Sequence, residues 1–160
     1  MFPKRVIYIL LSSLLFISCS SDDDDTLIDG TDVTDSVLIE INKLRTTGCK
    51  CGADDMPAVP ALISNPLLTK TAINYANDMN TRNYFAHISP EGTSPIQRTA
   101  AVGYTGKYVG EVIARNYSTS AEVVIGWKNS EDHCKAMMSN TYVEMGAGKS
   151  GNIWVANLGK

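Results

Sequence analysis

Histidine is scarce in this chain, which has only His87 and His133 among its 160 residues. Positive charge is also limited, since 14 Lys and Arg stand against 17 Asp and Glu and give a formal net charge of −3. Nucleic-acid-binding domains usually carry a stripe of clustered Lys and Arg, and the sequence has none. We therefore expect no nucleic-acid partner, and imidazole chemistry is confined to two positions.

Long hydrophobic runs are missing too, apart from Val6–Ile17, which only two serines interrupt. A transmembrane helix needs about 20 apolar residues, so this run is too short to span a bilayer comfortably. It follows Lys4 and Arg5, and a short apolar run after positive charge is typical of a secretory signal peptide. Residues 1–18 are therefore predicted to direct export.

The end of this run predicts a lipid anchor. Ser18–Cys19 resembles the lipobox of bacterial lipoproteins, although Leu15 lies one place earlier than the usual leucine. The resemblance implies cleavage before Cys19 and a lipid on its sulfur, which would attach the protein to the outer or cell-surface membrane. An ordinary secretory peptide with a chance cysteine is the alternative.

Four adjacent aspartates, Asp22–Asp25, follow this cysteine. Adjacent like charges repel and stay hydrated, so residues 19–32 are predicted to form a flexible tether. Acidic residues after a lipidated cysteine also resemble the surface-export signal of some Gram-negative lineages. We expect a cell-envelope protein anchored to the outer membrane, with surface display as a further hypothesis and a plain solvated spacer as the alternative.

The remaining residues, 33–160, suit one domain with its own core. Apolar residues at helical spacing predict a helix from Thr31 or Asp32 to Gly48, followed by a loop rich in turn-forming residues. Asn65–Pro66 and Ser94–Pro95 each start a further helix, because Pro is favoured at the first helical position. In the second half we expect a capping box at residues 119–122 that opens a fourth helix, a short helical turn at 133–138, and strands at 108–114, 142–147 and 152–158.

Two polar residues in these elements are candidates for function. His87 follows the second helix, between apolar Phe85 and Ile88, so packing can fix it on one side while the other side faces a cleft. Glu111 lies among apolar residues of the extended segment. It either points outward from an edge strand or points inward, where a buried carboxylate needs a partner.

Five segments in order, FAHISPEG, GEVIA, WKNSEDHC, YVEMGAG and NIWVANLG, resemble the bacterial branch of the CAP superfamily. That superfamily comprises the cysteine-rich secretory, antigen-five and pathogenesis-related proteins, and its bacterial members are often called SCP-like extracellular. The resemblance covers residues 33–160. It implies an α+β fold, a three-layer α-β-α sandwich with an antiparallel sheet between helical layers.

The resemblance also implies a cleft that gathers two histidines and one or two glutamates. By motif these are His87, Glu111 and His133, whereas Ser130 occupies the place of the second glutamate, three residues after Trp127. Two neutral imidazoles and a carboxylate suit a divalent transition metal, zinc favoured, with a position left for water. Their spacing matches no local zinc signature, and the alternative is that both histidines are hydrogen-bonded polar residues of the core.

The resemblance places one disulfide as well. It puts one cysteine after the glycine that ends the first helix and another directly after the second histidine, which implies a bridge between Cys51 and Cys134. Export favours disulfides. If Cys19 carries lipid, Cys49 is left over.

Three classes of function remain open. The resemblance favours a non-enzymatic binding module for a metal, a small or lipid-like ligand or a protein, because the family includes lipid binders and signalling proteins. A hydrolase that uses a metal-bound water is the second class. The third is an adhesion or envelope-structural protein with a vestigial cleft. Nucleophilic catalysis is disfavoured, because no GxSxG elbow is present and adjacent side chains such as those of His133 and Cys134 diverge on a helix.

The anchor yields the first prediction. The Cys19→Ala variant should move to the aqueous phase in a detergent partition of whole cells, because it lacks the sulfur that carries the lipid. The wild-type protein should stay in the detergent phase. Recovery of the wild type in the aqueous phase together with the variant would rule the anchor out.

Overall fold

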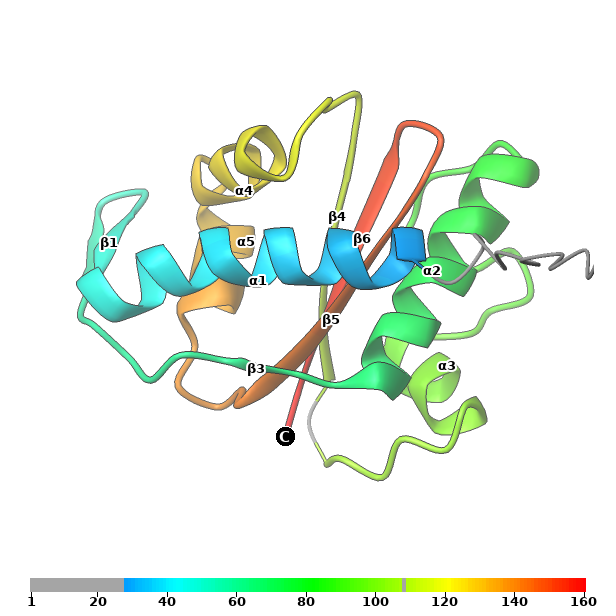
Figure 1. The fold of residues 1–160 in the computed structure, drawn as a ribbon, viewed down its shortest axis with the longest axis horizontal. Coiled ribbons are helices and arrows are strands. Elements are labelled where there is room, and N and C mark those ends of the chain that lie inside the picture. The colour runs from blue at the N-terminus through cyan, green and yellow to red at the C-terminus, as the bar shows by residue number, and fades with distance from the viewer. Residues whose placement is uncertain (1–27, 108) are drawn as a thin grey trace, which may run out of the picture.

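The computed structural model describes residues 28–107 and 109–160 (Figure 1). The expected signal peptide, the expected lipid site at Cys19 and most of the expected tether therefore lie outside the described residues. Within the described ranges, no helix combines the length and the apolar character needed to cross a bilayer.

A four-stranded sheet forms the centre of the fold, in the order β3-β5-β6-β4. Strand β5 (Glu144–Ser150) turns back into β6 (Ile153–Gly159), and β4 (Val109–Arg115) pairs antiparallel with β6 along its whole length. The short β3 (Ile63–Ser64) runs parallel to β5, so the expected antiparallel sheet has one parallel edge strand. Two residues are too few for a strand pattern to show in the sequence.

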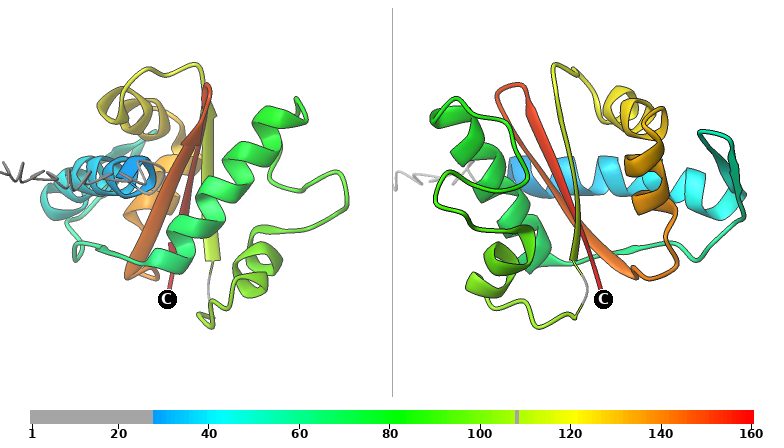
Figure 2. Two further views of the ribbon diagram at one scale, coloured as in Figure 1. Left: turned by 45° about the vertical axis from the view of Figure 1, so that its right-hand side comes forward. Right: turned by 180° about the vertical axis from the view of Figure 1, so that it is seen from behind.

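Helices cover both faces of this sheet, which confirms the three-layer α-β-α sandwich. Figure 2 shows α2 (Pro66–Thr81) and α3 (Pro95–Ala101) on one side of it. On the other side lie α1 (Ile28–Thr47), α4 (Ser120–Lys128) and α5 (Glu131–Met138). The sheet separates two buried apolar clusters, one under each helical layer.

Alternation along the strands decides which side each residue faces, because successive side chains of a strand point to opposite faces. Val112 and Ala114 of β4 pack in the cluster under α1 and α4, whereas Ile113 packs in the cluster under α2. Glu111 is two residues from Ile113. Its side chain is therefore directed to the face covered by α2 and α3.

Some element boundaries differ from the expected ones. Helix α1 already includes Ile28, the first described residue, and so extends N-terminal to the expected start at Thr31 or Asp32. The expected loop after Gly48 contains a small hairpin of β1 (Cys49–Cys51) and β2 (Asp54–Met56). The capping box between Thr119 and Glu122 is present as expected.

Two glycines let α2 lie directly on the sheet. A Cβ atom at Gly146 would overlap the backbone of Thr69, and one at Gly148 would overlap the backbone of Ile73. The absence of side chains at these two positions of β5 therefore sets how closely α2 approaches the sheet.

Buried Arg45 ties the end of α1 to the end of α5. Its side chain is 1% exposed and donates hydrogen bonds to four backbone carbonyls, those of Pro60 at 2.8 Å, Met137 at 2.6 Å, Ser139 at 2.9 Å and Tyr142 at 3.2 Å. Burial lowers the pKa of Arg45. The carbonyls at the C-terminal end of α5 carry partial negative charge, which suits a cation.

Replacing Arg45 should therefore destabilise the whole domain. In Arg45→Met these carbonyls lose their donors inside the protein, and we expect a loss of at least about 3 kcal/mol in unfolding free energy by denaturant titration. The matched control is Lys43→Met on the same helix. Lys43 forms an exposed ion pair with Glu40, worth about 0 to 1 kcal/mol. Equal denaturant midpoints for the two variants would contradict this role of Arg45.

Candidate functional site

The loop between α2 and α3 carries His87, and contacts on both sides of the histidine hold its backbone. Tyr75 of α2 donates a hydrogen bond through its hydroxyl to the carbonyl oxygen of Ala86 at 2.6 Å. Arg98 of α3 donates through Nη2 to the carbonyl oxygen of His87 itself at 3.0 Å. The peptide before the imidazole is thus tied to one helix and the peptide after it to the other.

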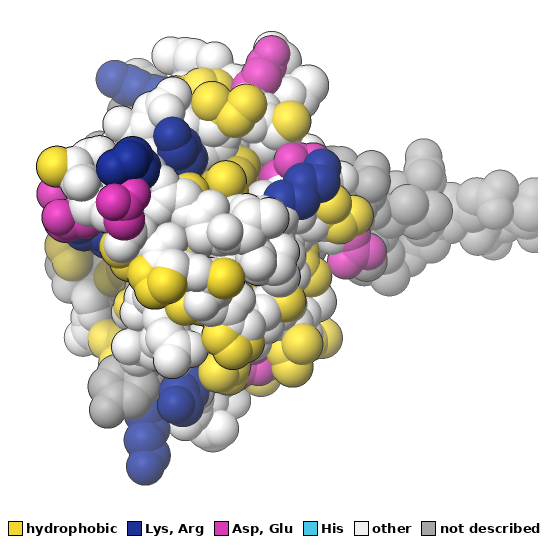
Figure 3. Space-filling view, turned by 90° about the vertical axis from the view of Figure 1, so that its left-hand side faces the viewer, with side chains coloured by type: hydrophobic (Ala, Val, Ile, Leu, Met, Phe, Trp, Pro, Cys, Tyr) yellow, Lys and Arg dark blue, Asp and Glu magenta, His cyan; other side chains and the backbone are white. Residues whose placement is uncertain are grey.

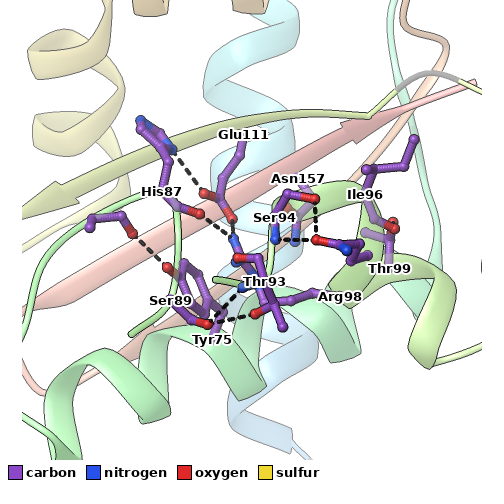
Figure 4. A network of polar contacts seen from close by, with 12 residues as sticks. Tyr75, His87, Ser89, Thr93, Ser94, Ile96, Arg98, Thr99, Glu111 and Asn157 are labelled. Carbon is purple, nitrogen blue, oxygen red and sulfur yellow. Dashed lines mark hydrogen bonds and ion pairs between the residues drawn. The ribbon is translucent and has the colours of Figure 1, made fainter. Parts of the chain in front are cut away.

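Glu111 meets His87 from strand β4 (Figure 4). The Glu111 side chain is 1% exposed, and its Oε1 lies 2.8 Å from Nδ1 of His87. Its other oxygen, Oε2, accepts a hydrogen bond from Nη2 of Arg98 at 2.7 Å. The carboxylate therefore points inward and does not face solvent from the edge strand. Both of its oxygens have the partners that a buried carboxylate needs.

Arg98 is the residue of this site that the sequence did not reveal. Besides its bond to the carbonyl oxygen of His87, it makes three further contacts: the ion pair with Glu111, a bond from Nη1 to the carbonyl oxygen of Thr93 at 2.7 Å, and stacking 3.3 Å from the ring centroid of Tyr75. One signal could have found it. A buried carboxylate needs a cation as its partner. In the segment that carries His87 and the following helix, between Arg82 and Lys107, Arg98 is the one Lys or Arg.

The contact with Glu111 fixes the form of the His87 ring. A carboxylate can only accept hydrogen bonds, so the hydrogen between Glu111 and His87 belongs to Nδ1. In the neutral imidazole this leaves the lone pair on Nε2. The His87 side chain is 46% exposed, so that nitrogen remains available to a ligand or a metal.

His133 approaches His87 from the opposite helical layer. It lies in the first turn of α5, and the two imidazole centroids are 6.4 Å apart, with the rings inclined at 58°. Burial lowers the pKa of His133, the neighbouring His87 lowers it further, and Asp132 opposes the shift. The ring is therefore neutral at pH 7, the form in which histidine binds metals.

Ser130 has a different position from the other three residues. It is the N-cap residue of α5, where its backbone carbonyl accepts from the amide of Cys134 at 2.8 Å. Its side chain makes no capping hydrogen bond. Within the described ranges no hydrogen bond joins the Ser130 side chain to His87, Glu111 or His133.

The arrangement gives Glu111 an orienting role. A carboxylate that accepts from one nitrogen of a histidine, and so directs the other nitrogen outward, is the usual arrangement behind a metal-bound histidine. The donors this site offers are the two imidazoles, and the carboxylate supports one of them. The two imidazoles fit a divalent metal in chemical type.

The Cys51–Cys134 disulfide is present and lies beside this site. The two Cα atoms are 5.4 Å apart, and the bridge joins β1 to the α5 residue that directly follows His133. Cys49 is a free thiol. Among the described residues, these three cysteines are the one group of three potential metal-ligating side chains whose ligand atoms all lie within 4.8 Å of one another.

Solved structures share this fold. An extracellular protein of Bacillus anthracis that contains an SCP domain matches over 81% of this chain and 41% of its own, with a TM-score of 0.71 and 23% identity. An outer surface protein of Borrelia burgdorferi matches over 83% of this chain and 96% of its own, with a TM-score of 0.69 and 24% identity. At these identities the two structures establish the fold alone.

A curated relative and a family model extend the comparison to the sequence. The uncharacterized protein YkwD of Bacillus subtilis is 39% identical over 89 residues, which are 54% of this chain and 35% of YkwD. This chain therefore spans about a third of that relative. The model of the CAP family, described as the cysteine-rich secretory protein family, matches residues 38–155. This match covers most of the domain, and the chain belongs to the CAP family.

Proposed function

We propose that this protein is an exported, lipid-anchored binding module that holds a divalent metal, zinc favoured, or a small or lipid-like ligand at His87 and His133. The observation that carries the proposal is the pairing of Glu111 with Nδ1 of His87 at 2.8 Å. That pairing leaves Nε2 on the side of a half-exposed imidazole that is turned away from Glu111, and the second imidazole is 6.4 Å away between centroids.

The protonation of the site supports a metal. Ligand imidazoles must be neutral, and burial keeps the pKa of His133 below its ordinary value. A bound divalent ion would supply a Lewis acid and lower the pKa of a bound water. His87 and His133 would hold it, and Glu111 would keep the His87 ring in the required tautomer.

The surroundings of His87 support a ligand with an apolar part. Its neighbours in the sequence, Phe85 and Ile88, are 37% and 51% exposed, which is high for large apolar side chains. A small molecule that offers a polar group to the imidazoles and an apolar part to these side chains fits that surface.

The expected location follows from the N-terminal residues and from the relatives. The solved structures with this fold include one protein described as extracellular and one described as an outer surface protein. Together with Ser18–Cys19 and the run Asp22–Asp25, this supports a lipid anchor in the outer membrane and display at the cell surface. The partner of the anchor is then the membrane itself.

Zinc titration by calorimetry tests the metal. We expect wild type to bind zinc at pH 7.5 and more weakly at pH 5.5, because protons compete with the metal for the imidazole nitrogens. Since the pKa of His133 lies below its ordinary value of 6.5, the loss of binding that His133 causes should begin below that pH. His133→Ala should lose detectable binding. Glu111→Gln should bind roughly 10- to 100-fold more weakly, because it removes the carboxylate that orients His87.

The matched control is Ser130→Ala, which removes a hydroxyl beside α5 that makes no capping hydrogen bond. It should bind zinc like wild type. Equal binding by wild type, His133→Ala and Glu111→Gln would show that zinc binds elsewhere. If no metal binds to the wild type, the metal is excluded, and the site is either a polar pocket for an organic ligand or a vestigial cleft.

A further inference from the structure

A free thiol lies against the disulfide. The Sγ atom of Cys49 is 3.8 Å from Sγ of Cys134, and all three sulfurs lie within 4.8 Å of one another. Cys51 and Cys134 are fully buried, whereas Cys49 is partly exposed. They share a small apolar cluster with Met138, apart from the two main clusters of the core.

The hairpin holds Cys49 in this position. Cys49 and Cys51 are two residues apart on β1, so both side chains point to the same face, the one that meets α5. The hairpin is fixed to α5 by an ion pair between Asp54 and Lys135 at 2.7 Å. In Figure 1 it rises beside the C-terminal end of α1, and Figure 3 shows acidic and basic side chains side by side on the face that includes it.

We propose that Cys49, Cys51 and Cys134 form a thiol–disulfide exchange site, in which Cys49 can replace Cys51 as the partner of Cys134. Cys49 first gives up its proton. Its thiolate attacks Sγ of Cys134, a Cys49–Cys134 bond forms, and the Cys51–Cys134 bond breaks. The electron pair of the broken bond stays on Cys51, which takes up a proton. The exchange consumes no oxidant or reductant.

The two disulfide isomers are close in chain entropy. The Cys51–Cys134 bridge spans a sequence separation of 83 residues, and a Cys49–Cys134 bridge would span 85. Loop-closure entropy changes only with the logarithm of loop length, so this term is nearly the same for both. Their relative population is therefore set by packing, which favours the bridge from buried Cys51.

The geometry and the protonation of Cys49 make the exchange slow. The three sulfur atoms are not in line, because all of them lie within 4.8 Å of one another. Attack along the axis of the disulfide bond therefore requires the Cys49 side chain to rotate, and its partial exposure allows this rotation. Burial raises the pKa of the Cys49 thiol, with Lys128 opposing the shift. Most of the thiol is therefore protonated at neutral pH, and each isomer persists long enough to be trapped by alkylation.

Tryptic mapping can distinguish the isomers, because Lys50 separates Cys49 from Cys51. Cleavage places Cys49 in peptide 46–50, Cys51 in peptide 51–70 and Cys134 in peptide 129–135. The full chain is incubated at pH 8, quenched with acid, alkylated with N-ethylmaleimide and digested without reduction. We expect the 51–70/129–135 pair to dominate and the 46–50/129–135 pair to appear at about 1 to 10 per cent, within the range of a minor native state.

Two variants calibrate this measurement. Cys51→Ser should form the Cys49–Cys134 bridge in nearly all molecules and so provides the authentic cross-linked peptide. Cys49→Ser should never yield maleimide on Cys51. The proposal is overturned if the 46–50/129–135 pair is absent from wild type. It is also overturned if a 46–50/51–70 pair appears in equal amount, because that product marks scrambling through the unfolded chain.

Discussion

A buried negative charge organises the site. The Glu111 side chain is 1% exposed, and an uncompensated carboxylate at such a position costs several kcal/mol. Arg98 supplies the compensating charge, and the same guanidinium also binds the carbonyl oxygen of His87. The requirement to neutralise one carboxylate therefore fixes the helix that carries Arg98, the loop that carries His87 and the tautomer of the imidazole.

The two histidines come from opposite layers and meet beside an edge strand. Among the described residues β4 pairs with β6 alone, so its other edge is the place where a residue of the α2–α3 layer can approach one from α5. The position of His133 then depends on what holds α5. The Cys51–Cys134 bridge acts at its first turn and Arg45 at its last, so the geometry of the imidazole pair depends on contacts at both ends of that helix.

Sequence reasoning predicted features that depend on local chemistry or on a matching motif. The caps at Asn65 and Thr119 follow from neighbouring residues, and the Cys51–Cys134 bridge follows from the family resemblance. Arg98 and Arg45 were missed, because neither sits in a motif and their roles arise only when distant segments meet. The short strands β1, β2 and β3 escaped for another reason, since two or three residues cannot display a period.

The glycines of β5 make the position of His87 sensitive to a substitution two strands away from Glu111. Helix α2 rests backbone to backbone on Gly146 and Gly148, and the hydroxyl of Tyr75 on the same helix holds the peptide just before His87. A single methyl group inserted beneath α2 would lift the helix, and the Tyr75 bond would pass that displacement to the imidazole. The close packing of α2 on the two glycines therefore sets the distance of His87 from the sheet.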